Sequence, residues 1–296
     1  MHDYMRAIGF SNDFSREGFR RLLSDVVYEA DKSFVSSVDE KNAKLEYLKF
    51  YGTDTGLIVR GTMEPTESGK DEIFIDYTIP FLKAKAISTT EKVVFEKHSA
   101  ADEYVGICDD YRLGMPLIFH LQNQNSYLSK KEEIDNSAID VLHISLAALS
   151  LNGAVMMPIE KNEADEQELK KRRSSRENLL RRARTGDEKA IENMAIEDMD
   201  TFSLLRKKAQ TEDVYSLVDS YFMPTGIECD EYSVLGEIKD VSEDINAITG
   251  IELWVLDVVA DDVYFNICIR KDDLMGEPEI GRRFKGSIWM QGYVEF

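Results

Sequence analysis

The stretch Ala260-Asp261-Asp262-Val263-Tyr264-Phe265-Asn266-Ile267-Cys268-Ile269-Arg270 contains the clearest structural signal in the sequence. After the two aspartates, an apolar side chain recurs at every second position, from Val263 to Ile269. A period of two is that of a β-strand with one buried face. Aspartates tolerate the backbone conformations of tight turns. The stretch therefore predicts a strand that leaves a tight turn.

Runs with the same period lie on both sides of this strand. Residues 232–241 and 251–259 precede it, and residues 283–296 follow it with glycines at Gly286 and Gly292, where a strongly bent strand would need them. Several short strands in so short a segment can bury a core only by closing on themselves. We predict a small OB-like β-barrel over 226–296. The alternative is one half of an ordinary β-sandwich.

The N-terminal part, residues 1–160, predicts a mostly antiparallel sheet with one long helix. A helix over 14–31 follows from one apolar stripe with helical spacing. The stripe consists of Phe19, Leu22, Leu23, Val26, Val27 and Ala30. Strand patterns follow at 57–63, 73–79, 93–95, 104–107 and 117–121. Asn152-Gly153, between two apolar runs, predicts a hairpin turn. The whole chain is thus of the α+β class.

A charged helical segment, residues 161–225, separates these two parts. Its basic stretch is the candidate anion-binding site, made of Lys170, Lys171, Arg172, Arg173, Arg176, Arg181, Arg182 and Arg184. A helix without an apolar face is either solvated or bridges between other parts of a protein. Three short helices should follow, begun by caps at Asp187, Thr201 and Thr211, the last with Tyr221 in its apolar stripe.

The distribution of charge sets limits on the partners. The chain has 36 basic and 56 acidic side chains, a net charge of −20. So acidic a protein repels nucleic acids and anionic membranes in general, and its net charge argues against nucleic acid as a partner overall. The basic stretch either faces the acidic parts of the same chain or contacts RNA or the ribosome. We favour the internal interpretation, because no aromatic residues are interleaved for base stacking.

The barrel poses the same question of nucleic-acid binding. Its aromatic and basic residues could form a binding platform, since OB-folds often bind oligonucleotides. The residues concerned are Tyr264, Trp289, Tyr293, Arg270, Arg282 and Lys285. The strongly acidic composition of residues 226–296 opposes this, so we expect these aromatic rings to pack in the core.

Cysteine usage and the N-terminus indicate a cytoplasmic protein. The three cysteines, Cys108, Cys229 and Cys268, are far apart in the sequence and form no C-x-x-C pair. This pattern favours buried thiols in a reducing compartment over disulfides or a zinc site. We see no signal peptide and no membrane span, and we predict no metal or cofactor.

No motif of nucleophilic, phosphate-binding or metal-dependent catalysis is present. The histidines His2, His98, His120 and His143 lack metal-ligand spacing. A deep pocket in which His120 or His143 meets two carboxylates would favour an enzyme.

Three stretches resemble an uncharacterised full-length protein family of anaerobic Gram-positive bacteria. They are Met1-His2-Asp3-Tyr4-Met5-Arg6-Ala7-Ile8-Gly9-Phe10-Ser11, Glu212-Asp213-Val214-Tyr215-Ser216-Leu217-Val218-Asp219 and Gly276-Glu277-Pro278-Glu279-Ile280-Gly281-Arg282-Arg283-Phe284-Lys285-Gly286. The resemblance implies a cytosolic bacterial protein of unknown role and assigns no residue a function.

The sequence therefore favours a non-enzymatic binding or interaction module, and a protein is the candidate partner. One alternative is RNA or ribosome contact through residues 170–184. The other is a hydrolase with an acid–base site in the N-terminal part, since catalytic residues on distant strands leave no local motif.

Overall fold

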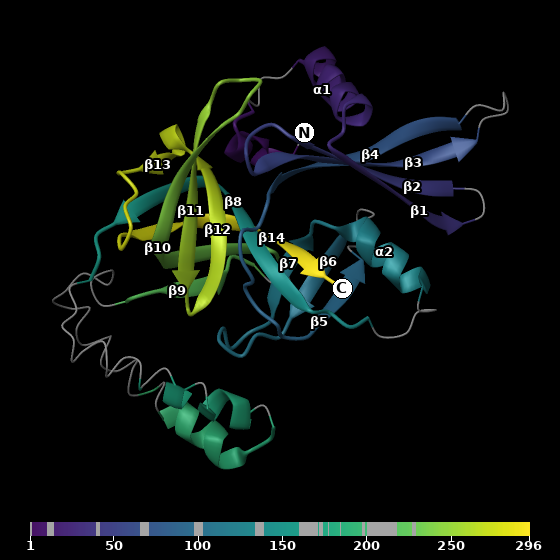
Figure 1. The fold of residues 1–296 in the computed structure, drawn as a ribbon. Helices are drawn as coiled ribbons and strands as arrows, with labels where there is room; N and C mark the ends of the chain where they lie inside the picture. The colour runs from purple at the N-terminus through teal and green to yellow at the C-terminus, as the bar shows by residue number, and fades with distance from the viewer. Residues whose placement is uncertain are drawn as a thin grey trace.

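The structure is a computed structural model. It describes residues 2–10, 15–39, 42–65, 71–97, 103–133, 139–159, 171, 174–176, 178–183, 185–196, 199, 218–226 and 229–296. The chain forms a four-stranded sheet, called sheet A, and a ten-stranded sheet that includes a closed barrel (Figure 1). This confirms the predicted α+β class with an N-terminal antiparallel sheet and a small barrel. In the described residues, no helix has the length and apolar composition of a membrane span.

Sheet A is an antiparallel meander of four consecutive strands. They are β1 (Lys32–Asp39), β2 (Asn42–Phe50), β3 (Thr55–Pro65) and β4 (Asp71–Leu82). The predicted strands at 57–63 and 73–79 are β3 and β4. We did not predict β1 and β2, because charged side chains such as Lys44, Glu46 and Lys49 interrupt the apolar pattern of β2.

The predicted long helix is α1 (Arg16–Tyr28), which covers one face of sheet A. It begins where the Ser15 side chain accepts a hydrogen bond from the backbone N–H of Gly18 at 3.0 Å. Leu22 and Val26 are buried against β2 and β3. We call this covered side the outer face of sheet A and the opposite side its inner face.

Five strands close the barrel in the order β8, β12, β11, β10, β14 and back to β8. Their bounds are β8 (His143–Met156), β10 (Glu231–Ile245), β11 (Glu252–Ala260), β12 (Val263–Arg270) and β14 (Arg283–Glu295). The predicted alternation in β12 is confirmed, because Phe265 and Ile267 belong to the barrel core while Cys268 faces outward. The Cys268 thiol donates to the carbonyl of Ala7.

The barrel needs β8, which lies outside the 226–296 segment that we predicted for it. The predicted hairpin at Asn152-Gly153 is wrong, since β8 runs through both residues as one strand. A Cβ on Gly153 would lie 2.5 Å from the Phe284 ring, so the glycine admits that buried ring. Opposite, Ser150 donates to the carbonyls of Asn152 and Ser287 at a β-bulge. The Asn-Gly pair therefore belongs to a bent strand rather than to a turn.

The second sheet extends beyond the barrel through three predicted strands. β7 (Leu117–Leu121) pairs with β14, and β6 (Tyr104–Cys108) and β5 (Val93–Lys97) continue outward. An unpredicted helix, α2 (Gln124–Glu133), follows β7 and contacts β1. In Figure 1, α1 lies above sheet A and α2 below it. α2 therefore lies on the side of sheet A opposite α1.

The remaining elements are short. They are η1 (Asp3–Ile8), β9 (Tyr221–Pro224), η2 (Lys271–Asp273) and β13 (Leu274–Met275). Asp187 caps a helix as predicted, accepting from the N–H of Lys189 at 3.1 Å. Tyr221 lies in strand β9 rather than in a helix, because it pairs with Leu235 of the barrel. The helices predicted from Thr201 and Thr211 to residue 217 lie outside the described residues.

Candidate ligand-binding site

A row of paired residues crosses the inner face of sheet A. Phe34 pairs with Glu46, Glu46 with Arg60, and Arg60 with Tyr77. Within this row, the Arg60 guanidinium donates to the Glu46 carboxylate at 2.7 Å, and both side chains are under 5% exposed. A buried ion pair loses hydration, so it is tolerated only where its other hydrogen-bonding groups also find partners.

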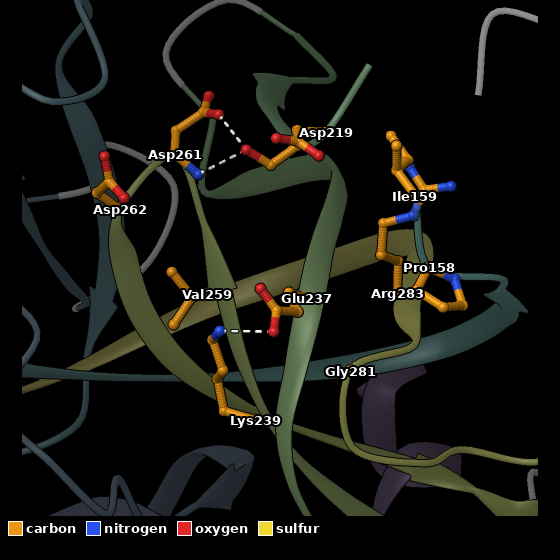
Figure 2. Close-up of a pocket in the computed structure, with 11 residues that line it drawn as sticks. Pro158, Ile159, Asp219, Glu237, Lys239, Val259, Asp261, Asp262, Gly281 and Arg283 are labelled. Carbon is orange, nitrogen blue, oxygen red and sulfur yellow. Dashed lines mark hydrogen bonds and ion pairs between the residues drawn. The ribbon is translucent and has the colours of Figure 1, made fainter. Parts of the chain in front are cut away.

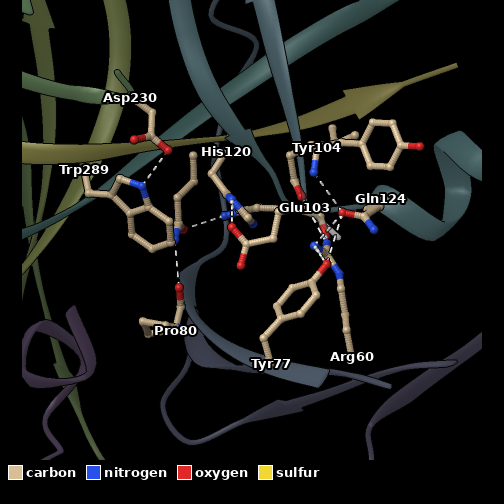
Figure 3. Close-up of polar contacts among 12 residues, drawn as sticks. Arg60, Tyr77, Pro80, Glu103, Tyr104, His120, Gln124, Asp230 and Trp289 are labelled. Atoms are coloured by element: carbon tan, nitrogen blue, oxygen red, sulfur yellow. Dashed lines mark hydrogen bonds and ion pairs between the residues drawn. The ribbon is translucent and has the colours of Figure 1, made fainter. Parts of the chain in front are cut away.

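The rest of the Arg60 guanidinium is bonded to β4 of sheet A, to the end of β7 and to the start of α2 (Figure 3). Its acceptors are the carbonyls of Leu121 and Gln122, the side-chain oxygen of Gln124 and the hydroxyl of Tyr77. Burial lowers the pKa of Arg60, but the charge of Glu46 and the contact with Tyr77 raise it by more. Arg60 is therefore charged, and it joins sheet A to the end of β7 and the start of α2.

Further buried polar contacts lie within the second sheet and between the two sheets. Gln122 donates to Gln291 at 2.9 Å, and Gln291 donates to the carbonyl of Pro80 at 2.7 Å. The Trp289 indole donates to Asp230 at 2.7 Å and is 5% exposed (Figure 3). Trp289 thus packs in the core, as we expected, and offers no surface for stacking bases. Tyr293 is 45% exposed, so the same expectation is wrong for that ring.

A pocket of about 500 Å³ opens between the inner face of sheet A and the ends of β8 and β14. We call it the inter-sheet pocket. Its wall is mostly apolar and is built from Phe34, Leu48, Phe50, Ile58, Phe81 and Ala84. Several polar side chains line it without a hydrogen bond or ion pair in the described parts of the chain, namely Lys32, Lys83, Ser126, His143, Ser145, Tyr293 and Glu295. These groups are available to a ligand.

Three of these polar groups lie together at the ends of the barrel strands. His143 and Glu295 are opposite each other in the pairing of β8 with β14. Burial raises the pKa of Tyr293, and the charges of Glu295 and Glu46 raise it further. Like an ordinary tyrosine, Tyr293 is protonated at neutral pH and can donate a hydrogen bond.

A second cavity of about 370 Å³ adjoins the inter-sheet pocket along α2. The two share Phe34, Ser126, Tyr293 and other lining residues. Asn125 lines the second cavity and is 3% exposed. Its buried side-chain nitrogen has no hydrogen-bond partner among the described residues. Such a buried donor is costly unless an acceptor reaches it.

The barrel has a separate polar pocket of about 460 Å³ at its other end (Figure 2). Its charged groups bond their own neighbours. Lys239 pairs with Glu237 at 2.6 Å, and the Ser220 hydroxyl donates to the Asp261 carboxylate at 2.7 Å. Arg283 donates to two backbone carbonyls. These contacts make the rim of this pocket part of the barrel structure.

The family match covers both sheets. A family model described as "Domain of unknown function, E. rectale Gene description (DUF3881)" matches residues 5–292. The chain belongs to the DUF3881 family. The resemblance to an uncharacterised family over nearly the whole chain is therefore confirmed. No curated protein and no solved structure matches the chain significantly.

In this DUF3881 chain, part of the basic stretch contacts the protein itself. The Arg181 guanidinium lies 4.6 Å from the centre of the Tyr111 ring, and Arg182 pairs with Asp187 at 2.7 Å. Lys171 is exposed, and Arg176 lines a cavity beside the β11–β12 turn. The other four candidates, Lys170, Arg172, Arg173 and Arg184, lie outside the described residues. Whether the stretch binds an anion stays a prediction.

The histidines of the DUF3881 chain have different settings. His120 is 2% exposed, and its ring lies 3.9 Å from the Glu103 carboxylate. His143 lines the inter-sheet pocket together with Glu46 and Glu295. His98 is outside the described residues, within which no group of three or more His, Cys, Asp or Glu could hold a metal ion.

The described cysteines include two buried thiols. Cys108 and Cys268 are buried, and Cys229 is partly exposed. Burial, followed by the charge of Asp110, raises the pKa of Cys108 to about 12. This thiol is therefore not an activated nucleophile.

Sequence reasoning missed the Arg60–Glu46 pair and the pocket beside it. The local signals were two charged residues, Glu46 and Arg60, inside stretches of strand-forming residues. Such a signal becomes specific only when the strand register is known.

Proposed function

We propose that the protein is a non-catalytic binding module that holds a small ligand with an apolar body in the inter-sheet pocket. The observation that carries this proposal is the pocket itself, with a mostly apolar wall and polar side chains that lack partners. Ligand sites in proteins are commonly concave, apolar and about 300–1,000 Å³ in volume, with a few polar groups that orient the ligand.

The network around Arg60 supports a pocket that exists before the ligand arrives. Arg60 and Gln122 bond groups on both sheets, so the walls are held at a fixed separation. A preformed site binds more tightly because fewer side chains lose freedom on binding.

Binding of N-phenyl-1-naphthylamine tests the proposal. This neutral probe fluoresces more strongly in apolar surroundings, and we expect saturable binding to the full chain. Ala84→Trp should abolish the signal, since Ala84 is in the pocket wall. Ala183→Trp is the matched control, because Ala183 is also half-buried but belongs to the helical segment. No binding, or equal binding by the Ala84→Trp variant, would contradict the proposal.

A second candidate function is a hydrolase, favoured by the position of His143. This imidazole shares the pocket with Glu295, a possible acid–base partner. p-Nitrophenyl octanoate is a suitable substrate, because its chain is apolar and its product is coloured. A hydrolase would release nitrophenol well above the buffer rate, and His143→Gln would reduce that rate by roughly 10²–10⁴-fold. We expect no release above the buffer rate.

A further inference from the structure

The charges around the inter-sheet pocket point to the chemistry of its ligand. Two cations, Lys32 and Lys83, line it without an ion pair among the described residues. Glu46 is offset by Arg60, which leaves Glu295 as the opposing charge. The site thus has two cations against one anion, a surplus of +1, inside a chain of −20.

The hydrogen-bonding groups around the pocket also favour an anionic ligand, because they include donors without acceptors in the described part of the chain. Asn125 lines the adjoining cavity, and its buried side-chain nitrogen is a donor without an acceptor among the described residues. Tyr293 lines the inter-sheet pocket, and its phenolic O–H is protonated at neutral pH, so it too can donate. A carboxylate offers only acceptors, with about four lone-pair positions, and so matches a site rich in donors.

The apolar wall requires the rest of the ligand to be hydrocarbon. Phe50 and Phe81 pack edge to face with ring centres 5.2 Å apart. Ile58 and Phe81 are buried, so this end of the pocket is screened from water. Charged or strongly hydrated groups would lose hydration there without gaining partners.

We infer that the inter-sheet pocket binds an amphipathic carboxylate, with its hydrocarbon body against sheet A and its carboxylate towards Lys32, Lys83 and the donors near α2. This inference rests on the proposed binding function and specifies the class of ligand. Glu295 is the group that opposes it, because its charge would favour an amine instead.

Competition against N-phenyl-1-naphthylamine tests the sign of the ligand charge. The competitors are octanoate, octylammonium and 1-octanol, which share one hydrocarbon chain. We expect octanoate to displace the probe at the lowest concentration. If octylammonium or octanol binds as tightly as octanoate, or if octanoate does not displace bound probe, the inference is overturned and the proposed function stands. If the probe itself does not bind, both the proposed binding function and the inference about its ligand are overturned.

Charge variants at the rim provide a second measurement on proteins that should fold normally, since the altered side chains are exposed. Lys83→Met should weaken octanoate binding about three- to fivefold, as expected for a partly exposed ion pair, and leave octanol unchanged. Glu295→Gln should tighten octanoate binding by a similar factor. Lys92→Met, an exposed lysine outside the pocket, is the control and should change neither ligand. Equal effects on octanoate and octanol would show that charge does not select the ligand.

Discussion

The Arg60 guanidinium bonds groups from β2, β4, the end of β7 and the start of α2, and its removal would leave Glu46 as a buried, isolated carboxylate. We therefore predict that Arg60→Met lowers the free energy of unfolding by about 3–5 kcal/mol, the cost of breaking a buried pair. Urea denaturation followed by circular dichroism measures this change.

Removal of both charges distinguishes two causes of lost stability: the unpaired buried carboxylate of Glu46 and the lost packing of the Arg60 side chain. The double variant Arg60→Met with Glu46→Leu has no unpaired charge, so it should be clearly more stable than Arg60→Met alone. If the double variant loses as much stability as the single one, the buried charge of Glu46 is not the cause.

Asp110 gives the protein a pH-dependent contribution to stability. Burial raises the pKa of this carboxyl, but the hydrogen bonds from Arg112 lower it by more, so the net pKa in the folded state is below the usual value. The folded state therefore prefers the ionised form. Its stabilisation is present above the unfolded pKa of about 3.9 and is lost as the pH falls through the folded pKa.

Asp110→Asn tests this linkage. Wild type should melt at a lower temperature at pH 3 than at pH 6, and Asp110→Asn should melt lower than wild type at pH 6 with a smaller difference between the two pH values. Asp109→Asn, at the exposed neighbouring aspartate, serves as the control. Parallel melting curves for wild type and Asp110→Asn would show that another carboxyl dominates acid unfolding.

At the scale of elements, Gly153 shows how a local signal can mislead. Asn-Gly is a strong turn signal, yet here it lies in β8 against a buried ring of β14. We predict that Gly153→Ala costs about 1–3 kcal/mol, because the added Cβ would overlap the Phe284 ring, which is fully buried and cannot move away. Gly226→Ala is the control: its added Cβ would lie 3.4 Å from the Cys229 sulfur, an ordinary contact, so it should lower the free energy of unfolding by less. Gly114→Ala is a poor control, because Gly114 has a positive φ that alanine rarely adopts. Chemical denaturation of the Gly153→Ala and Gly226→Ala variants decides the point.

The elements that sequence patterns predicted are those whose signal is local. The helical stripe of α1 and the alternation of β12 each lie within one segment of the chain. The closure of the barrel depends instead on pairs such as Asn152 with Ser287, which are far apart in the sequence. The inter-sheet pocket is equally non-local, because its wall extends from Lys32 to Glu295. No short motif could have indicated it.

At the scale of the whole molecule, the chain has a negative net charge, whereas its basic stretch is locally positive. Residues 170–184 hold eight basic side chains and one acidic one, against a total of −20. Two of those arginines already contact Tyr111 and Asp187. A polyanion would have to displace such contacts and approach a strongly negative protein.

We therefore predict that the protein does not retain RNA in filter-binding measurements, at either 50 mM or 200 mM salt. A protein that neutralises six or more phosphates would instead bind at low salt and lose about 10³-fold or more in affinity between these concentrations. Retention that falls with salt, and that is lost when Arg172, Arg173, Arg176 and Arg181 are replaced by Gln, would establish contact through the basic stretch. Replacement of the exposed Arg16, Arg20 and Arg21 of α1 by Gln is the control, since it removes three positive charges elsewhere on the surface. A loss of retention with the control variant as well would assign the effect to overall charge rather than to this segment.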